Sequence, residues 1–100
     1  MQTQMITIEA YCTHHHAEPS FIDALEKGGL LTITLMNEER FIDYDQLELL
    51  ECYTRWYYDM EINVPGIDAI NNMLQKIKQM QQEIQDLRHQ LAVYKSNQLL

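Results

Sequence analysis

Short apolar runs at helical spacing occupy the first thirty positions and predict two helices. Met5–Ile8 is expected to be extended, and Thr7 is a suitable N-cap for a first helix over Ile8–Thr13. A second helix is expected over Pro19–Lys27, because proline is tolerated in a first turn and the Gly28-Gly29 pair ends the run. The apolar stripes of these two helices consist of Ile8, Tyr11, Cys12, Phe21, Ile22 and Leu25.

The middle of the chain predicts a β-hairpin followed by a third helix. Leu30–Leu35 is rich in β-branched residues and partly alternating, which favours a strand. A turn at residues 37–39 would return the chain as a second strand over Arg40–Ile42. Asp43 and Gln46 have the spacing of a capping box, so we expect the third helix to run over about Tyr44–Met60.

The third predicted helix carries apolar residues over nearly half of its circumference. One side holds Leu49, Tyr53, Trp56 and Met60, and the neighbouring side holds Leu47, Leu50, Thr54 and Tyr57. One interpretation is that the core and a coiled-coil dimer together cover all of these residues. The other is that part of the group is an exposed anchor for a partner, since tyrosine and tryptophan are preferred at interface hot spots.

A long final helix is predicted from about Ile67, after a break at Val64-Pro65-Gly66. Its apolar residues step by three and four, and the register changes phase at Ile77. From there a heptad seam consists of Ile77, Met80, Ile84, Leu87, Leu91 and Tyr94. A seam of this length predicts a two-stranded coiled coil with a second chain, and folding back onto the chain's own head is the alternative.

The order helix, turn, helix, hairpin, helix and dimerising helix resembles the MerR-type winged helix-turn-helix proteins. Where those regulators carry a run such as Arg-Tyr-Tyr-Glu-x-x-Gly-Leu, this chain has Asp23-Ala24-Leu25-Glu26-Lys27-Gly28-Gly29-Leu30, with the Glu, Gly and Leu positions in agreement. The resemblance implies a mainly α fold with a small β-hairpin wing, followed by a long C-terminal coiled-coil helix. We expect a winged-helix head over residues 1–64 and a dimerisation helix over residues 65–100.

The charge of the chain is unevenly distributed. The formal net charge is −8, and residues 1–65 carry twelve carboxylates against three cationic side chains, a net charge of −9. Residues 66–100 carry three carboxylates and four cations, a net charge of +1. A nucleic-acid-binding domain needs cations that neutralise phosphates, so the acidic head favours a basic protein partner and disfavours nucleic acid. The alternative interpretation is that the negative charge is kept for solubility.

The positions that bind DNA in MerR regulators are changed here. The exposed side of the second helix holds phosphates and base edges there through arginine and tyrosine, whereas the corresponding residues of this chain are Ser20, Asp23, Ala24 and Leu25. At the wing tip, which is often basic in that family, this chain has Asn37-Glu38-Glu39-Arg40. These substitutions predict that the scaffold is kept while the DNA-binding site is replaced.

Within the MerR-like proteins, the chain resembles the CbpM group of chaperone modulators. The resemblance is carried by Ile6–Cys12 with His14, by Phe41-Ile42-Asp43, and by Val64-Pro65-Gly66-Ile67. It implies binding to the J-domain of a DnaJ-like (CbpA-type) co-chaperone, whose basic helix would face the acidic head, and inhibition of that co-chaperone. The residues predicted to contact the partner are Glu18, Asp23, Glu26, Glu48, Glu51 and Trp56. The alternative function is a MerR-like DNA-binding transcriptional regulator.

Other chemistry finds little support in the sequence. Adjacent residues of the His14–His16 run point in different directions on a helix, so no metal site is predicted. Neither a nucleophile elbow nor a phosphate-binding glycine loop is present, so no cofactor and no enzymatic activity are expected. Cys12 and Cys52 are expected to be reduced and buried. The lack of a signal peptide or a long apolar run predicts a cytoplasmic protein without a membrane span.

Overall fold

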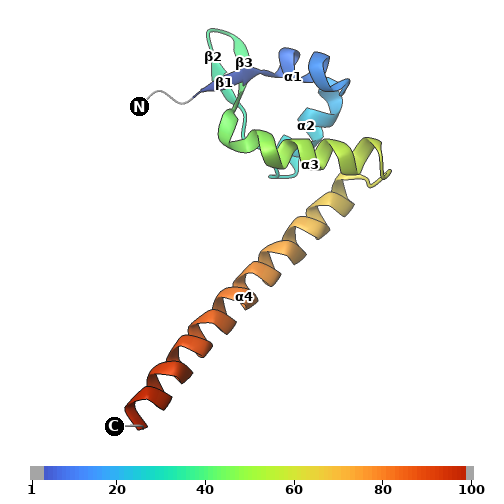
Figure 1. Ribbon diagram of the computed structural model, residues 1–100. Coiled ribbons are helices and arrows are strands. Elements are labelled where there is room, and N and C mark those ends of the chain that lie inside the picture. The colour runs from blue at the N-terminus through green and yellow to red at the C-terminus, as the bar shows by residue number, and fades with distance from the viewer. Residues whose placement is uncertain (1–3, 99–100) are drawn as a thin grey trace. The chain divides into compact units, whose positions relative to one another are not determined.

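The computed structural model describes residues 4–98 and divides into two compact units (Figure 1). The first unit, the head, ends at Asp68, and the second begins at Ala69. The predicted class is confirmed, because helices dominate, a small antiparallel sheet forms the wing, and a long helix closes the chain. The elements are β1 (Met5–Thr7), α1 (Ile8–His15), α2 (Pro19–Lys27), β2 (Thr34–Met36), β3 (Glu39–Asp43), a 3₁₀ turn (Tyr44–Gln46), α3 (Leu47–Tyr58) and α4 (Val64–Gln98).

The ends of α1 and α2 follow from local capping chemistry. The hydroxyl of Thr7 accepts the N–H of Ala10 at 3.1 Å, which confirms the predicted N-cap. α1 runs two residues beyond its predicted end and stops where His16 adopts a left-handed conformation, φ 55°. α2 has the predicted bounds. It ends in a Schellman motif in which Gly29 has φ 77° and the N–H of Leu30 donates to the carbonyl of Leu25 at 2.9 Å.

The sheet is antiparallel with strand order β1-β3-β2, and Ile6 pairs with Ile42 in the register of its first two members. The predicted strand over Leu30–Leu35 is wrong in its first four residues, because β2 begins only at Thr34. The side-chain amide of Gln46 binds both backbone groups of Thr32: its Oε1 accepts the N–H at 2.9 Å and its Nε2 donates to the carbonyl at 2.8 Å. These two bonds replace the ladder bonds that a strand would provide.

The same amide also explains why the predicted capping box does not form. Gln46 is bonded to Thr32, and the side chain of Asp43 makes no capping hydrogen bond. The chain therefore passes through the 3₁₀ turn over Tyr44–Gln46, and α3 begins at Leu47, three residues later than predicted. It ends at Tyr58, two residues before the predicted Met60.

α4 begins at Val64, so the predicted break at Val64-Pro65-Gly66 is wrong. Asn63 caps the helix by accepting the N–H of Gly66 at 2.8 Å. Pro65 is accommodated because the N–H groups of a first turn need no intrahelical partner. Gly66 lies so close to the cap that a Cβ atom would sit 2.9 Å from Cγ2 of Ile62 and 3.0 Å from Oδ1 of Asn63.

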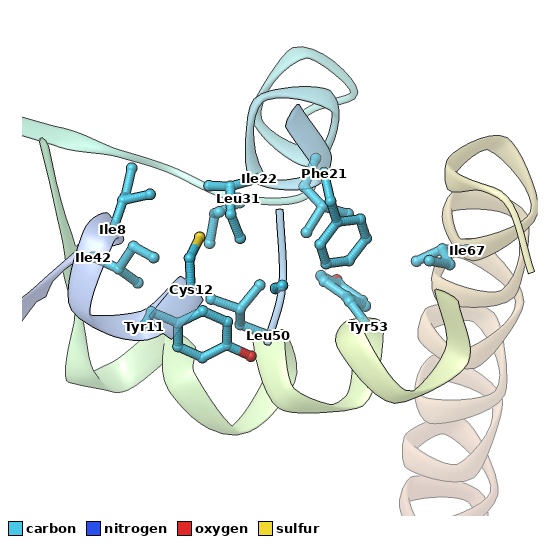
Figure 2. Close-up of a cluster of buried hydrophobic side chains, with 12 residues drawn as sticks. Ile8, Tyr11, Cys12, Phe21, Ile22, Leu31, Ile42, Leu50, Tyr53 and Ile67 are labelled. Carbon is cyan, nitrogen blue, oxygen red and sulfur yellow. The ribbon is translucent and has the colours of Figure 1, made fainter. Parts of the chain in front are cut away.

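The head has a single apolar core to which α1, α2, α3, the sheet and the first turn of α4 contribute (Figure 2). Seven large side chains of the core are exposed by less than 2%: Tyr11, Ile22, Leu25, Ile42, Leu50, Tyr53 and Ile67. The stripes predicted for the first two helices are thus the faces that are buried. Cys12 lies in this core as expected, whereas Cys52 is only half-buried, and the two thiols are not joined.

Candidate protein interface

An arginine ties the wing to the second helix of the head. The guanidinium of Arg40, on β3, forms an ion pair with Asp23 and lies 3.8 Å from Oε1 of Glu26, both on α2. All three side chains are partly exposed, at 39%, 55% and 47% for Arg40, Asp23 and Glu26. The cation of the wing is therefore already neutralised by carboxylates from within the head.

The wing tip holds two exposed carboxylates on a tight turn. Asn37 and Glu38 join β2 to β3 as a two-residue loop, with φ values of 50° and 64°. Positive φ at both central residues is the geometry of a type I′ turn, which matches the twist of a hairpin. Asparagine tolerates this conformation, but it is unfavourable for a residue such as Glu38. The turn displays Glu38 and Glu39 to solvent.

A groove of about 740 Å³ separates this wing tip from α1. Its rim carries the carboxylates of Glu9, Glu38 and Glu39, together with Arg40. The remaining lining comes from the end of β1, from α1, from the connection between α1 and α2, and from the first residue of α2: Thr7, Ile8, Cys12, Thr13, Ala17 and Pro19. Burial raises the pKa of the Cys12 thiol, with a smaller contribution from Asp23, so the thiol stays protonated and apolar in character.

The exposed surface of α2 is acidic, but it is smaller than the sequence predicted. Ser20 and Asp23 are exposed and Ala24 is half-buried. The assignment of Leu25 to this surface is wrong, because Leu25 is fully buried. Its side chain belongs to the apolar stripe that holds α2 on the core.

The six residues predicted to contact a partner fall into separate places. Asp23 and Glu26 come together around Arg40. Glu18 precedes α2, and its N–H donates to the hydroxyl of Tyr58 on α3 at 2.8 Å. The remaining three predicted residues, Glu48, Glu51 and Trp56, all lie on α3.

On α3 the three predicted residues have different surroundings. Glu48 is exposed, and Oε1 of Glu51 lies 3.8 Å from Nε2 of His15. Trp56 is half-buried and packs against the core, with its ring centroid 5.9 Å from that of Tyr53. The exposed aromatic surface at this end of α3 comes instead from Tyr57 and Tyr58, which pack on Phe21 at centroid distances of 4.5 and 5.4 Å.

The histidine run divides between packing and solvent. The ring of His15 stacks on Tyr11 at a centroid distance of 4.1 Å, while His14 and His16 are exposed. Over residues 4–98, no three side chains of His, Cys, Asp or Glu lie together as a metal site would require.

The comparisons with known proteins identify the family. A family model described as MerR HTH family regulatory protein matches residues 6–89, which is most of the head and of α4. The chain belongs to this MerR family. No curated protein and no solved structure matches the chain. The match identifies a regulatory domain of the MerR type and does not reach the finer resemblance to the CbpM group.

The apolar seam of α4 is exposed to solvent in this MerR family member. Taken by itself, the second unit exposes each seam residue by 48–63%: Ile77, Met80, Ile84, Leu87, Leu91 and Tyr94. Such an apolar stripe needs a covering surface, because each large side chain contributes about 1.5–3 kcal/mol when it is buried. Within residues 4–98 there is no helix that is both long and apolar enough to cross a membrane.

Sequence reasoning missed two features of the MerR head. The first is the pairing of Arg40 with α2, which the charge pattern did not reveal because the partners are seventeen residues apart. The second is the groove between Glu9 and the wing tip. The Asn37-Glu38 dipeptide was its only local signal, because asparagine at a two-residue hairpin loop favours the turn that places both carboxylates at the rim.

Proposed function

We propose that this MerR family member is a non-enzymatic, homodimeric protein–protein interaction module. Its partner would be the J-domain of a DnaJ-like (CbpA-type) co-chaperone, whose activity it would inhibit. The observation that carries the proposal is the neutralisation of Arg40 by Asp23 and Glu26. Where a DNA-binding winged helix offers cations to phosphate, this head offers carboxylates on α2 and on the wing tip.

Charge complementarity supports a basic partner. Opposed surface charges accelerate encounter and fix orientation, and their effect weakens as salt screens them. The resemblance to the CbpM group supplies the identity of the partner, because J-domains present a basic helix. The family match leaves a DNA-binding regulator as the second candidate. The acidic surface of α2 disfavours this function, because its carboxylates would repel the phosphates of DNA.

Calorimetric titration of a CbpA-type J-domain into the full chain, at low and high salt, tests the proposal. We expect binding that weakens as the salt concentration rises, together with loss of J-domain-stimulated ATP hydrolysis by the Hsp70-type chaperone. Absence of binding heat at both salt concentrations, over several temperatures, would refute the chaperone function.

A double charge reversal tests the predicted surface separately. Asp23→Lys with Glu26→Lys would place two cations beside Arg40 and should weaken binding at low salt. If the affinity depends neither on the salt concentration nor on this double substitution, the J-domain remains the partner but α2 is not the surface that it contacts.

A further inference from the structure

We propose that the groove between α1 and the wing tip binds a basic amphipathic segment of the partner. The inference rests on the proposed function and adds the contact surface, which differs from the six residues predicted from the sequence. The groove combines an apolar floor with an acidic rim, and the two ends of that rim come from residues twenty-nine positions apart, Glu9 and Glu38.

The floor of the groove can accept the apolar part of a long side chain. Ile8, Cys12 and Ala17 line the groove and keep only 6–8% of their surface exposed. The volume of the groove, about 740 Å³, lies within the range of roughly 300–1,000 Å³ that is typical of pockets for small ligands. Lysine and arginine suit such a place, because their methylene stems cover apolar surface while their charged ends remain at the edge.

The rim provides unpaired anions for those charged ends. Within the described part of the chain, the ion pairs involve neither Glu9 nor Glu38 nor Glu39. Arg40 also reaches the groove, but Asp23 and Glu26 hold its guanidinium. The net field at the rim therefore attracts cations, and a charge-assisted hydrogen bond to a carboxylate is roughly twice as strong as a neutral one.

The same geometry disfavours the other occupants of a winged-helix surface. The wing and α2 are the elements that would meet a phosphate backbone, and here their carboxylates would repel it. A purely apolar peptide would leave three carboxylates to be desolvated without partners, which is unfavourable. A cationic segment with alternating apolar contacts satisfies both the floor and the rim.

The test uses matched pairs of charge-neutralising substitutions in the full chain. Glu38→Gln with Glu39→Gln removes two rim charges, and Glu48→Gln with Glu51→Gln removes two charges from α3. We expect the rim pair to weaken J-domain binding about tenfold at low salt, which corresponds to ~1.4 kcal/mol, and the α3 pair to leave it unchanged. If the α3 pair weakened binding and the rim pair had no effect, the groove would not be the contact surface.

A single substitution separates binding from folding. Glu38→Gly relieves the left-handed backbone at the wing tip, so it should raise stability while removing one rim carboxylate. We expect weaker J-domain binding by about threefold, in line with the loss of one exposed charge, together with a higher midpoint of urea unfolding. Unchanged binding in this variant would show that the wing tip does not contact the partner.

Backbone amide spectra distinguish failure of the groove from failure of the proposed function. The probes are the J-domain and, separately, a synthetic helical peptide of lysine and leucine. Shifts confined to residues 7–17 and 38–40 with both probes support the groove. Shifts at these residues with the peptide alone would support the groove as a binding site and refute the proposed J-domain function. J-domain shifts elsewhere, or no shifts with either probe, overturn the groove.

Discussion

Two buried tyrosines of the head differ in whether their hydroxyl groups are paired. The hydroxyl of Tyr11 lies 2.7 Å from that of Thr54, which in turn donates to the carbonyl of Leu50 at 2.8 Å. The hydroxyl of Tyr53 is buried, and among the described residues it has no hydrogen-bond partner. A buried polar group without a partner costs more than a paired one gains, so the two residues should respond oppositely to loss of the hydroxyl.

Phenylalanine substitutions test this difference. Tyr11→Phe should lower the free energy of unfolding by about 1 kcal/mol, because it removes a buried hydrogen bond. Tyr53→Phe should leave it unchanged or raise it by up to ~1 kcal/mol, because it removes an unpaired hydroxyl. Urea unfolding followed by Trp56 fluorescence at one protein concentration measures both. Equal destabilisation by the two variants would contradict the assignment.

The same residues predict alkaline sensitivity. Burial raises the pKa of Tyr11 and of Tyr53 above the ordinary value of 10.0. The unfolded chain therefore loses these two protons at a lower pH than the folded chain. The contribution of the two tyrosines to the free energy of unfolding is complete below about pH 10, and it is lost as the pH rises through their higher pKa values in the folded state. The urea midpoint of the wild type should fall between pH 8 and pH 11, and the midpoint of Tyr53→Phe should fall by less. An equal fall in the two proteins would contradict it.

The helices of the head could be predicted where local chemistry decides their ends. Thr7, Pro19 and Gly29 act through their own backbone geometry or through neighbours a few residues away, and the elements they delimit were recognised. Gln46 and Asn63 were missed because each side chain has competing partners, and only the folded chain shows which partner it takes. The groove was missed because its rim is formed by residues of α1 and of the wing tip, which are distant in sequence and come together only in the folded chain.

The end of α2 provides a test at this scale with two adjacent glycines. Gly29 has φ 77°, so Gly29→Ala should destabilise the head by about 1–2 kcal/mol. Gly28 has φ −80°, and a Cβ atom there would be 3.4 Å from its nearest neighbour, so Gly28→Ala should be neutral or slightly stabilising. Urea unfolding compares the two, and similar effects would show that the Schellman motif does not set the end of α2.

The seam of α4 is the second test of an element. Leu87→Asp places a charge in the middle of the exposed apolar stripe and should convert a dimer into a monomer at tens of micromolar, because it forfeits about 1.5–3 kcal/mol of burial per chain. Gln85→Asp adds the same charge on the outer face of the helix, away from the seam, and should leave the dimer intact. Sedimentation equilibrium distinguishes them. A wild-type chain that sediments as a monomer would end the coiled-coil prediction.

For the whole molecule, the decisive property is where charge lies on a family scaffold. In this chain Arg40 holds the wing against α2, and residues 1–65 carry a net charge of −9. Arg40, the cation of the wing, is paired with Asp23 and lies close to Glu26. DNA binding depends on cations that release counterions from phosphate, and each lost contact lowers affinity at every sequence. The scaffold thus determines the geometry of the face, and we expect its charged side chains to determine the class of partner.

Absence of useful DNA affinity follows from this charge map. Gel shifts of the wild-type chain against a pool of random duplexes at low salt should show no complex at micromolar protein. A variant with Asp23→Arg, Glu38→Lys and Glu39→Lys reverses the sign of the face without touching the core, so it should acquire non-sequence-specific binding that weakens steeply as salt rises. That gain would show that the fold still presents the face correctly and that charge alone excludes DNA. Enrichment of one palindromic sequence by the wild-type chain would reverse the conclusion, because specific recognition would then survive on an acidic surface.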